Sequence, residues 1–228
     1  MSARRFKLVP EMEGPIARWY ARQRATESQI RTMRSDATRL TEGLSGGARV
    51  LEIAPGPGQL AVEIARLGRF AVVGLDISQT FVAIARENAA RAGVDIDFRH
   101  GDAADIPFAA DSFDLVVCQA AFKNFAEPVR ALDEMHRVLR AGGTAVIQDL
   151  SKDASSADID REVQGMKLSR VNTFVTKWVL STMLRRRAYT SEQFRHLVAT
   201  SAFRNCDIRK EGIGFEVRLN KSPLKKAA

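Results

Sequence analysis

The segment from Arg49 to Leu60, R-V-L-E-I-A-P-G-P-G-Q-L, constrains the fold of this chain more than any other segment. An apolar run rich in β-forming residues stops at a Pro/Gly turn over residues 55–58, and apolar residues then recur at helical spacing from Leu60. This order predicts a strand, a tight turn and a helix. Glycine lets a ligand approach the turn closely, and the N-terminus of the following helix favours an anionic group. A nucleotide-like cofactor is therefore the first hypothesis.

Two cofactor classes fit this turn. The stretch 56–61, G-P-G-Q-L-A, satisfies the G-x-G-x-x-G/A dinucleotide pattern, and Asp76 follows the next predicted strand about 20 residues on, where a ribose partner belongs. That pattern by itself favours NAD. Glu52 favours a cationic ligand instead, because a carboxylate just before the turn would repel a pyrophosphate. Asp102, after the third predicted strand, adds a carboxylate to which an exocyclic amine can bind.

Further stretches carry a family resemblance. They are, in chain order, L-E-I-A-P-G-P-G, V-G-L-D-I-S, G-D-A-A-D-I-P-F, S-F-D-L-V-V and E-M-H-R-V-L-R-A-G-G. Across residues 50–150 the chain thus resembles the class I S-adenosylmethionine-dependent methyltransferases, in particular the small-molecule group that includes the quinone C-methyltransferases. The resemblance implies an α/β fold with a Rossmann-like, open, mostly parallel sheet, helices on both faces and an antiparallel strand near the C-terminal end. It implies S-adenosyl-L-methionine as the cofactor.

The resemblance also assigns roles in cofactor binding. The turn over 54–58 should bring backbone N–H groups to the tail carboxylate, and Glu52 should lie near the positively charged side of that tail. Asp76 should accept both ribose hydroxyls, while Ile77 lies on the adenine and Asp102 accepts from its amine. The predicted cofactor-binding residues are Glu52, Ala54, Gly56, Gly58, Asp76, Ile77, Asp102, Ala103, Gln119 and Ala120. Ala54 departs from the family, which usually has glycine at this position.

The methyl acceptor is expected to bind beyond the fourth and fifth strands. Residues 122–125 and Asp149 follow these strands, at the carboxyl edge where ligands of open α/β sheets bind. The acceptor-side candidates are Tyr20, Phe122, Lys123, Asn124, Phe125, Asp149 and Trp178, and no catalytic residue is assigned. Because aromatic and apolar side chains dominate this set, we expect a small apolar or aromatic metabolite as the acceptor. A general base is needed only if the acceptor loses a proton.

The chain length favours a single domain. At 228 residues with 45% apolar content, residues 1–228 can bury one substantial α/β core as a single methyltransferase domain. Its predicted parts are a helical cover over 14–44, a cofactor-binding core over 49–150, a helical insertion or lid over 154–185, and a closing helix and hairpin over 190–219.

Within the core, strands and helices should alternate. After the first strand, we expect strands over 70–75, 96–99 and 113–118, a long helix ending in 139–143, and hairpin strands over 205–210 and 214–219. Right-handed crossovers would stack the repeated strand and helix units into a parallel sheet.

The net charge of +8 raises the question of a nucleic-acid partner. The segment 119–125 has neither the Asn/Asp-Pro-Pro-aromatic turn nor the Pro-Cys pair of nucleobase methyltransferases, which argues against that partner. An RNA-modifying methyltransferase recruited by the basic surface and a non-catalytic cofactor-binding protein stay as alternatives.

The remaining features concern metals and location. Cys118 and Cys206 lack metal-like spacing, so neither a metal site nor a disulfide is expected. No apolar run approaches the roughly 20 residues of a membrane span, and the first residues carry no signal-peptide pattern, so a cytoplasmic location is expected. The sequence sets no oligomeric state.

Overall fold

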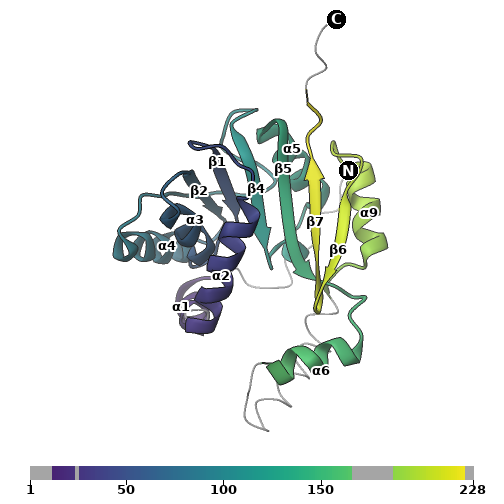
Figure 1. The fold of residues 1–228 in the computed structure, drawn as a ribbon, viewed down its shortest axis with the longest axis horizontal. Coiled ribbons are helices and arrows are strands. Elements are labelled where there is room, and N and C mark those ends of the chain that lie inside the picture. Colours follow the sequence, from purple (N-terminus) through teal and green to yellow (C-terminus); the bar gives the residue numbers. More distant parts are fainter. Residues whose placement is uncertain (1–11, 24–25, 166–186, 224–228) are drawn as a thin grey trace, which may run out of the picture.

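A mixed β-sheet forms the centre of the molecule (Figure 1). The computed structural model describes residues 12–23, 26–165 and 187–223. In these residues the sheet has seven strands in the order β3-β2-β1-β4-β5-β7-β6. The strands are β1 (Arg49–Ile53), β2 (Ala71–Asp76), β3 (Asp97–His100), β4 (Phe113–Gln119), β5 (Leu139–Leu150), β6 (Asp207–Glu211) and β7 (Gly214–Asn220).

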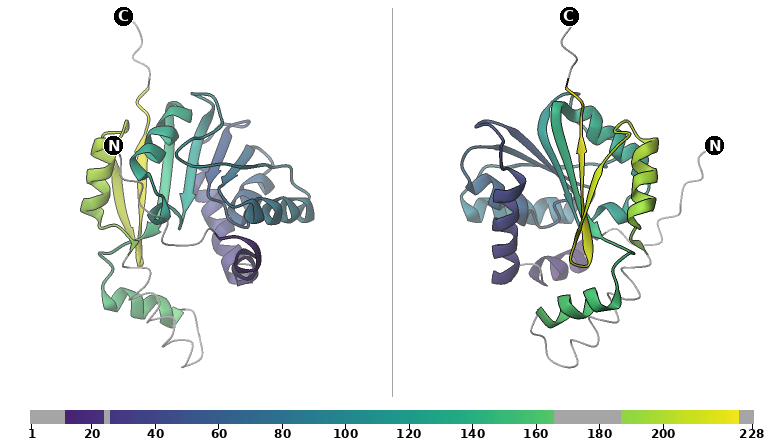
Figure 2. Two further views of the ribbon diagram at one scale, coloured as in Figure 1. Left: turned by 180° about the vertical axis from the view of Figure 1, so that it is seen from behind. Right: turned by 45° about the vertical axis from the view of Figure 1, so that its right-hand side comes forward.

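Helices cover both faces of this sheet (Figure 2). The described helices are α1 (Gly14–Gln23), α2 (Glu27–Leu40), α3 (Gln59–Arg66), α4 (Gln79–Ala92), the short 3₁₀ helix η1 (Phe122–Asn124), α5 (Pro128–Val138), α6 (Ser156–Gly165) and α9 (Ser191–Thr200). Helix α6 lies beyond the end of the sheet rather than on one of its faces (Figure 1). Among the described residues, no helix is both long enough and apolar enough to cross a membrane.

The strand pairing confirms the predicted fold class. The strands β3, β2, β1, β4 and β5 are mutually parallel, and β7 pairs antiparallel with both β5 and β6. Strand order reverses between β1 and β4, because β2 and β3 extend the sheet on one side of β1 while β4 and β5 extend it on the other. In open α/β sheets this reversal point is where ligands bind, beyond the carboxyl ends of the strands.

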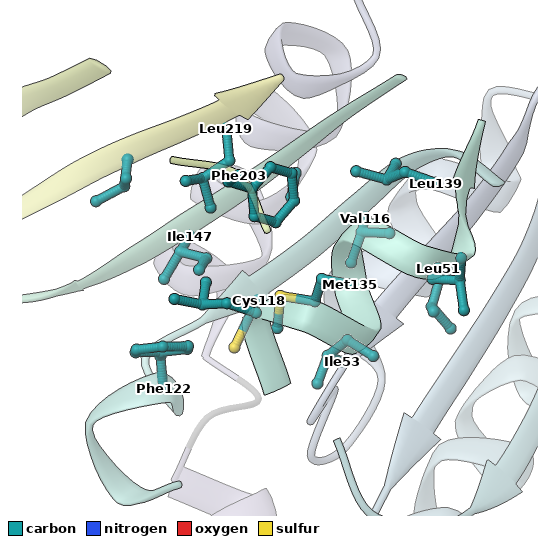
Figure 3. Close-up of a cluster of buried hydrophobic side chains, with 14 of the residues drawn as sticks. Leu51, Ile53, Val116, Cys118, Phe122, Met135, Leu139, Ile147, Phe203 and Leu219 are labelled. Atoms are coloured by element: carbon teal, nitrogen blue, oxygen red, sulfur yellow. The ribbon is translucent and has the colours of Figure 1, made fainter. Parts of the chain in front are cut away.

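Alternate residues of the strands supply two apolar cores. On one face, Leu51 and Ile53 of β1 pack with α5 and α9, and Figure 3 shows both among the side chains of this cluster. On the other face, Val50 packs with α2, α3 and α4. Strands buried on both faces are the expected state of a parallel sheet covered by helices. Cys118 lies in the first cluster as a buried free thiol, and burial raises its pKa.

Two helix boundaries differ from the sequence-based prediction. The cover predicted over 14–44 contains two helices, because extended backbone at Thr26, with ψ of 149°, starts α2 as a separate helix. The long helix predicted to end in 139–143 stops at Val138. Leu139 already pairs with Phe113, and a register shift in β4 together with the positive φ of Gly142 carries the chain on into β5.

The predicted insertion over 154–185 is described only in part. Helix α6 begins at Ser156, and residues 166–186 lie outside the described residues, among them the acceptor-side candidate Trp178.

Candidate functional site

Two buried carboxylates lie at the carboxyl ends of β1 and β2. Glu52 is 3% exposed and Asp76 is 5% exposed. Asp76 Oδ2 accepts a hydrogen bond from the Gly56 N–H at 2.9 Å, and Oδ1 accepts from the Ser78 N–H at 2.8 Å. Glu52 Oε2 is buried and has no hydrogen-bond partner among the described residues. A buried polar atom without a partner is costly, so this oxygen is a place where a ligand donor is expected.

Burial also changes the acidity of both groups. Loss of hydration raises the pKa of Glu52 to about 8, and the nearby charge of Asp76 adds to this effect. Loss of hydration raises the pKa of Asp76 to about 6, although the N–H groups of Ser78 and Gly56 counteract part of the rise. In the described part of the chain, no Lys or Arg forms an ion pair with either carboxylate. Among the described residues, neither carboxylate thus has a Lys or Arg partner, and a positively charged ligand would complete the site.

The turn between β1 and α3 uses its own N–H groups within the protein. Ala54 N–H donates to Leu75 O at 2.8 Å and Gly58 N–H donates to Pro55 O at 3.0 Å, while Gly56 donates to Asp76. The tail carboxylate was expected at these donors. In this structure the N–H groups without a partner among the described residues are those of Gln59 and Leu60, at the first turn of α3. An anion is therefore better placed at the helix start than at the turn itself.

The two glycines of this turn have different roles. A Cβ on Gly58 would lie 2.7 Å from Phe98 Cζ, so Gly58 permits close packing of the turn on β3. A Cβ on Gly56 would meet nothing within 4 Å, so open space lies in front of this residue. Both have positive φ, as does Ala54 at 54°, which explains why glycine suits all these positions.

The predicted adenine-side residues lie at the ends of β2 and β3. Ile77 is 37% exposed, which is unusual for a large apolar side chain, and its carbonyl oxygen lies 3.0 Å from His100 Nε2. Asp102 is exposed, and its Oδ1 accepts from the Ala104 N–H at 2.9 Å. The N–H of Ala103 has no partner among the described residues. An exposed apolar side chain and an open N–H are features to which a flat heterocycle can bind.

Glu13 joins this edge and was missed by the sequence analysis. Its carboxylate accepts from the N–H groups of Gln79 at 2.8 Å and Thr80 at 3.1 Å and from the Thr80 hydroxyl. Ser78 Oγ donates to Met12 O at 2.7 Å. These bonds fasten the start of α1 to the start of α4, directly after Asp76. Residues 66 or 67 positions apart make these contacts, so no local pattern signals them.

The acceptor-side candidates Tyr20, Phe122, Asn124 and Phe125 differ in position and exposure. Tyr20 packs edge-on against Phe81, with ring centroids 5.9 Å apart, so it lies on the α4 side of the site. Phe122 is fully buried in the apolar core, which places it beneath the site surface, whereas Asn124 is exposed. Phe125 is half-buried against Phe122, with ring centroids 5.2 Å apart.

Lys123 and Asp149 form a buried ion pair. Lys123 Nζ lies 2.7 Å from Asp149 Oδ1, and the Lys123 N–H donates to Asp149 Oδ2 at 2.9 Å. Both side chains are buried. Because each satisfies the other, this pair shapes the loop after β4 rather than offering polar anchors to an acceptor.

A polar network that the sequence analysis also missed extends from Gln119. The Gln119 amide donates to Asp36 Oδ2 at 3.3 Å and to Gln148 Oε1 at 2.5 Å, and Gln148 donates to Glu216 Oε2 at 3.0 Å. Arg39 contacts both Asp36 and Glu216. Strand register explains the alignment, since Gln119 pairs with Gln148 and Gln148 with Glu216 across β4, β5 and β7.

The network and the carboxylate pair share one face of the sheet. Glu52 pairs with Val117, and Gln119 lies two residues further along β4, so both side chains point to the α2 and α3 face. Gln119 is therefore next to the turn that follows β1, on the other side of the strand-order reversal.

Comparison with known proteins finds a family match for part of this chain. Residues 51–147 match the methyltransferase domain family. This match contains the last three residues of β1, the glycine turn, Asp76, Asp102 and Gln119. Residues 51–147 carry the methyltransferase domain of this family, and the fold is similar to that of solved S-adenosylmethionine-dependent methyltransferases. The predicted family and its cofactor, S-adenosyl-L-methionine, are thereby confirmed.

Curated relatives of the methyltransferase domain include quinone-modifying enzymes. A demethylmenaquinone methyltransferase of Deinococcus radiodurans is 38% identical over 108 residues, which are 47% of this chain and 45% of that protein. A ubiquinone/menaquinone biosynthesis C-methyltransferase of Bdellovibrio bacteriovorus is 34% identical over 111 residues, 48% of this chain and 47% of that protein. The match thus spans about half the length of these relatives.

Solved structures share the fold over a longer range. A protein of Methanococcus maripaludis assigned to the S-adenosyl-L-methionine-dependent methyltransferases superposes with a TM-score of 0.76 at 19% identity, covering 98% of this chain and 100% of that one. An S-adenosylmethionine-dependent methyltransferase of Aquifex aeolicus gives 0.69 at 15% identity, covering 89% and 97%. At these identities the likeness concerns the fold.

Proposed function

We propose that this protein transfers a methyl group from S-adenosylmethionine to a small aromatic acceptor of the quinone type. The observation that carries the cofactor assignment is Glu52, whose buried Oε2 has no partner among the described residues and lies near the second buried carboxylate, Asp76. Two carboxylates that pair with no Lys or Arg in the described part of the chain suit a ligand that carries an ammonium and a sulfonium group.

The fit extends to the other parts of the cofactor. We assign the amino group of its tail to Glu52 and the tail carboxylate to the open N–H groups at the start of α3. The ribose belongs at Asp76, whose oxygens keep lone pairs beyond those used by Gly56 and Ser78. The exposed Ile77 supports one adenine face, and Asp102 and the Ala103 N–H supply its polar contacts.

When bound, the cofactor supplies an electrophilic methyl group on a sulfonium. The protein's own contribution is positioning, which is the main source of rate in such displacements. Gln119 ends β4 beside the glycine turn, Ala120 follows it, and the buried Lys123–Asp149 ion pair holds the loop after β4. Methyl transfer to carbon or oxygen takes an electron pair from the acceptor and releases one acceptor proton.

The acceptor class rests on the relatives and on the chemistry of the residues. The curated relatives are named for demethylmenaquinone and ubiquinone/menaquinone biosynthesis, and another, from Ruegeria pomeroyi, for ubiquinone biosynthesis O-methylation at 33% identity over 116 residues, 51% of this chain and 46% of that protein. Phe125 and Tyr20 add partly exposed aromatic surface. We therefore favour an aromatic ring with oxygen substituents over a nucleic acid or NAD. We further propose that the whole chain folds as one methyltransferase domain.

Calorimetry followed by a turnover assay tests this function. Purified protein should bind S-adenosylmethionine and S-adenosylhomocysteine, which raises its melting temperature, whereas NAD should leave it unchanged. A chemically reduced, short-chain demethylmenaquinone analogue should then yield S-adenosylhomocysteine and a methylated ring. Stabilisation by NAD alone would contradict the cofactor assignment. Cofactor binding without turnover of any aromatic acceptor would favour the non-catalytic alternative.

A further inference from the structure

We infer that Gln119 presents its amide oxygen to the methyl acceptor and thereby selects acceptors that carry a hydroxyl or N–H beside the reacting atom. This inference rests on the proposed function, because it names the acceptor chemistry of the same site.

The amide nitrogen of Gln119 is already used within the protein. It donates to Asp36 Oδ2 at 3.3 Å and to Gln148 Oε1 at 2.5 Å. A primary amide has two N–H bonds, so these two acceptors consume both. The nitrogen therefore has no hydrogen left for a ligand.

The orientation of the amide follows from the groups at the two ends of the network. Asp36 is a carboxylate held by Arg39, with Nη2 3.0 Å from Asp36 Oδ1, and an ionised carboxylate only accepts hydrogen bonds. The Gln119 group that faces it must therefore be the NH₂. At the other end, Glu216 accepts from Gln148 Nε2 at 3.0 Å, so Gln148 must turn its oxygen toward Gln119. Both amides are fixed in one direction.

Two arginine side chains keep Glu216, the last carboxylate of this hydrogen-bond network, ionised. Arg39 lies 2.5 Å from Glu216 Oε2, and Arg218 Nε lies 2.8 Å from Glu216 Oε1. These hydrogen bonds and charges lower the pKa of Glu216 against the opposing effect of its burial. A glutamate that stays ionised cannot donate, so the chain of donors from Gln119 to Glu216 does not reverse.

The Gln119 oxygen is left for a ligand. Gln119 Oε1 has no hydrogen-bond partner among the described residues, and Gln119 is the last residue of β4, next to the turn after β1. The neighbouring backbone is engaged, because the Ala120 N–H donates to Gln148 O at 2.7 Å. An acceptor molecule beside Gln119 therefore meets a hydrogen-bond acceptor.

This geometry discriminates between oxidation states of a quinone-type ring. A hydroquinone hydroxyl can donate to Gln119 Oε1, whereas a quinone carbonyl would place two acceptors against each other with no proton between them. The reduced ring is also the one that can supply an electron pair to an electrophilic methyl group. We expect the site to bind the hydroquinone form.

The inference is tested by measuring the equilibrium binding of a quinone and its hydroquinone to the protein in complex with S-adenosylhomocysteine. The probe is 2,3-dimethyl-1,4-naphthoquinone and its hydroquinone, which have nearly the same shape and no unsubstituted quinone carbon to which a cysteine thiol can add. Under argon, with protein saturated by S-adenosylhomocysteine, the hydroquinone should bind about tenfold more tightly. In Gln119→Leu this preference should fall to about twofold. The dissociation constant for S-adenosylhomocysteine is measured alongside it, because the family resemblance also places Gln119 among the cofactor-binding residues.

A second variant tests the orientation of the Gln119 amide rather than the presence of the Gln119 side chain. Asp36→Asn removes the acceptor-only group, so the Gln119 amide can rotate and the preference for the hydroquinone should shrink. The matched control is Glu27→Gln, which makes the same charge change on α2 in an exposed residue whose ion-pair partner is Arg31. It should keep the full preference.

Specific outcomes would overturn the inference. Equal affinity of the parent protein for the two redox forms would do so, as would an unchanged preference in Gln119→Leu. Loss of S-adenosylhomocysteine binding in Gln119→Leu would show instead that this residue contacts the cofactor. If the parent protein binds no S-adenosylhomocysteine at all, the proposed function fails before the inference is reached.

Discussion

Lys123 Nζ and Asp149 Oδ1 form a buried ion pair, 2.7 Å apart, that fastens the loop after β4 to the end of β5. The Lys123 ammonium also donates to Ala120 O, and Ala120 has a positive φ of 56°. A non-glycine residue in this conformation needs support from its surroundings. The pair thus connects the stability of the fold to the position of the residues that end β4.

The first prediction follows from this pair. Lys123→Met should lower the free energy of unfolding by about 3–5 kcal/mol, because Asp149 would remain as a buried charge without its partner. Urea denaturation measures the change. Arg31→Met is the matched control, since the Arg31–Glu27 pair is exposed, with 3.9 Å between the atoms, and should cost about 0–1 kcal/mol. The double variant Lys123→Met/Asp149→Asn should lose less stability than the sum of its single variants, and strict additivity would show that the two side chains are not coupled.

A second prediction separates the two glycines of the turn. Gly58→Ala should destabilise the protein by more than about 2 kcal/mol, since its Cβ would collide with Phe98 and Ala85 in addition to the strain of a positive φ. Gly56→Ala should cost only about 1–2 kcal/mol of stability from φ alone. Its larger effect should be weaker binding of S-adenosylmethionine, because the methyl group would fill the open space before the turn. Unchanged affinity in Gly56→Ala would place the cofactor elsewhere.

The pKa of Glu52 can be tested by measuring the stability of the protein, by heat and by urea, as a function of pH. Its pKa of about 8 in the folded protein lies above the ordinary value of 4.5, so between these values the folded state holds a proton that the unfolded state has lost. Stability should therefore fall as pH rises from 5 to 9. Glu52→Gln should reduce this fall by a few kcal/mol, at about 1.4 kcal/mol per pKa unit, and should stabilise the ligand-free protein most at the alkaline end. An identical pH slope in Glu52→Gln would show that Glu52 titrates normally.

Cofactor binding should release a proton near neutral pH. A cationic ligand stabilises the ionised form of Glu52, so the group loses its proton when the ligand arrives. Titration calorimetry at pH 7 in two buffers with different ionisation enthalpies measures this release as a difference in apparent binding enthalpy. The difference should vanish in Glu52→Gln.

Asp76 and Asp102 should differ in their importance. Asp76→Ala should weaken S-adenosylmethionine binding by about 1.5–3 kcal/mol, the scale of hydrogen bonds to a charged group. It also frees the N–H groups of Gly56 and Ser78, which adds local disorder to the turn. Asp102→Ala should cost less, because Asp102 is exposed and Ile77 and the Ala103 N–H also contact the adenine in our assignment. Equal losses in the two variants would contradict the assignment of the ribose to Asp76.

The sequence by itself determined the parts of this protein that depend on residues close together in the chain. The strand, turn and helix over 49–66 follow from an apolar run, two glycines and helical spacing, and Asp76 follows from the end of the next strand. These features are fixed by local conformational preferences, so a linear pattern contains them. The family and its cofactor could be predicted for the same reason.

Only the tertiary structure decided which distant side chains meet. The end of α5 at Val138 depends on pairing between Leu139 and Phe113, and Glu13 reaches α4 across 66 residues. Strand register places Gln119 beside Gln148, and a slip of one residue in either strand would turn its side chain to the other face. Lys123 and Asp149 looked like open polar anchors until the fold joined them. Burial and register are properties of the packed sheet, which no short stretch of sequence encodes.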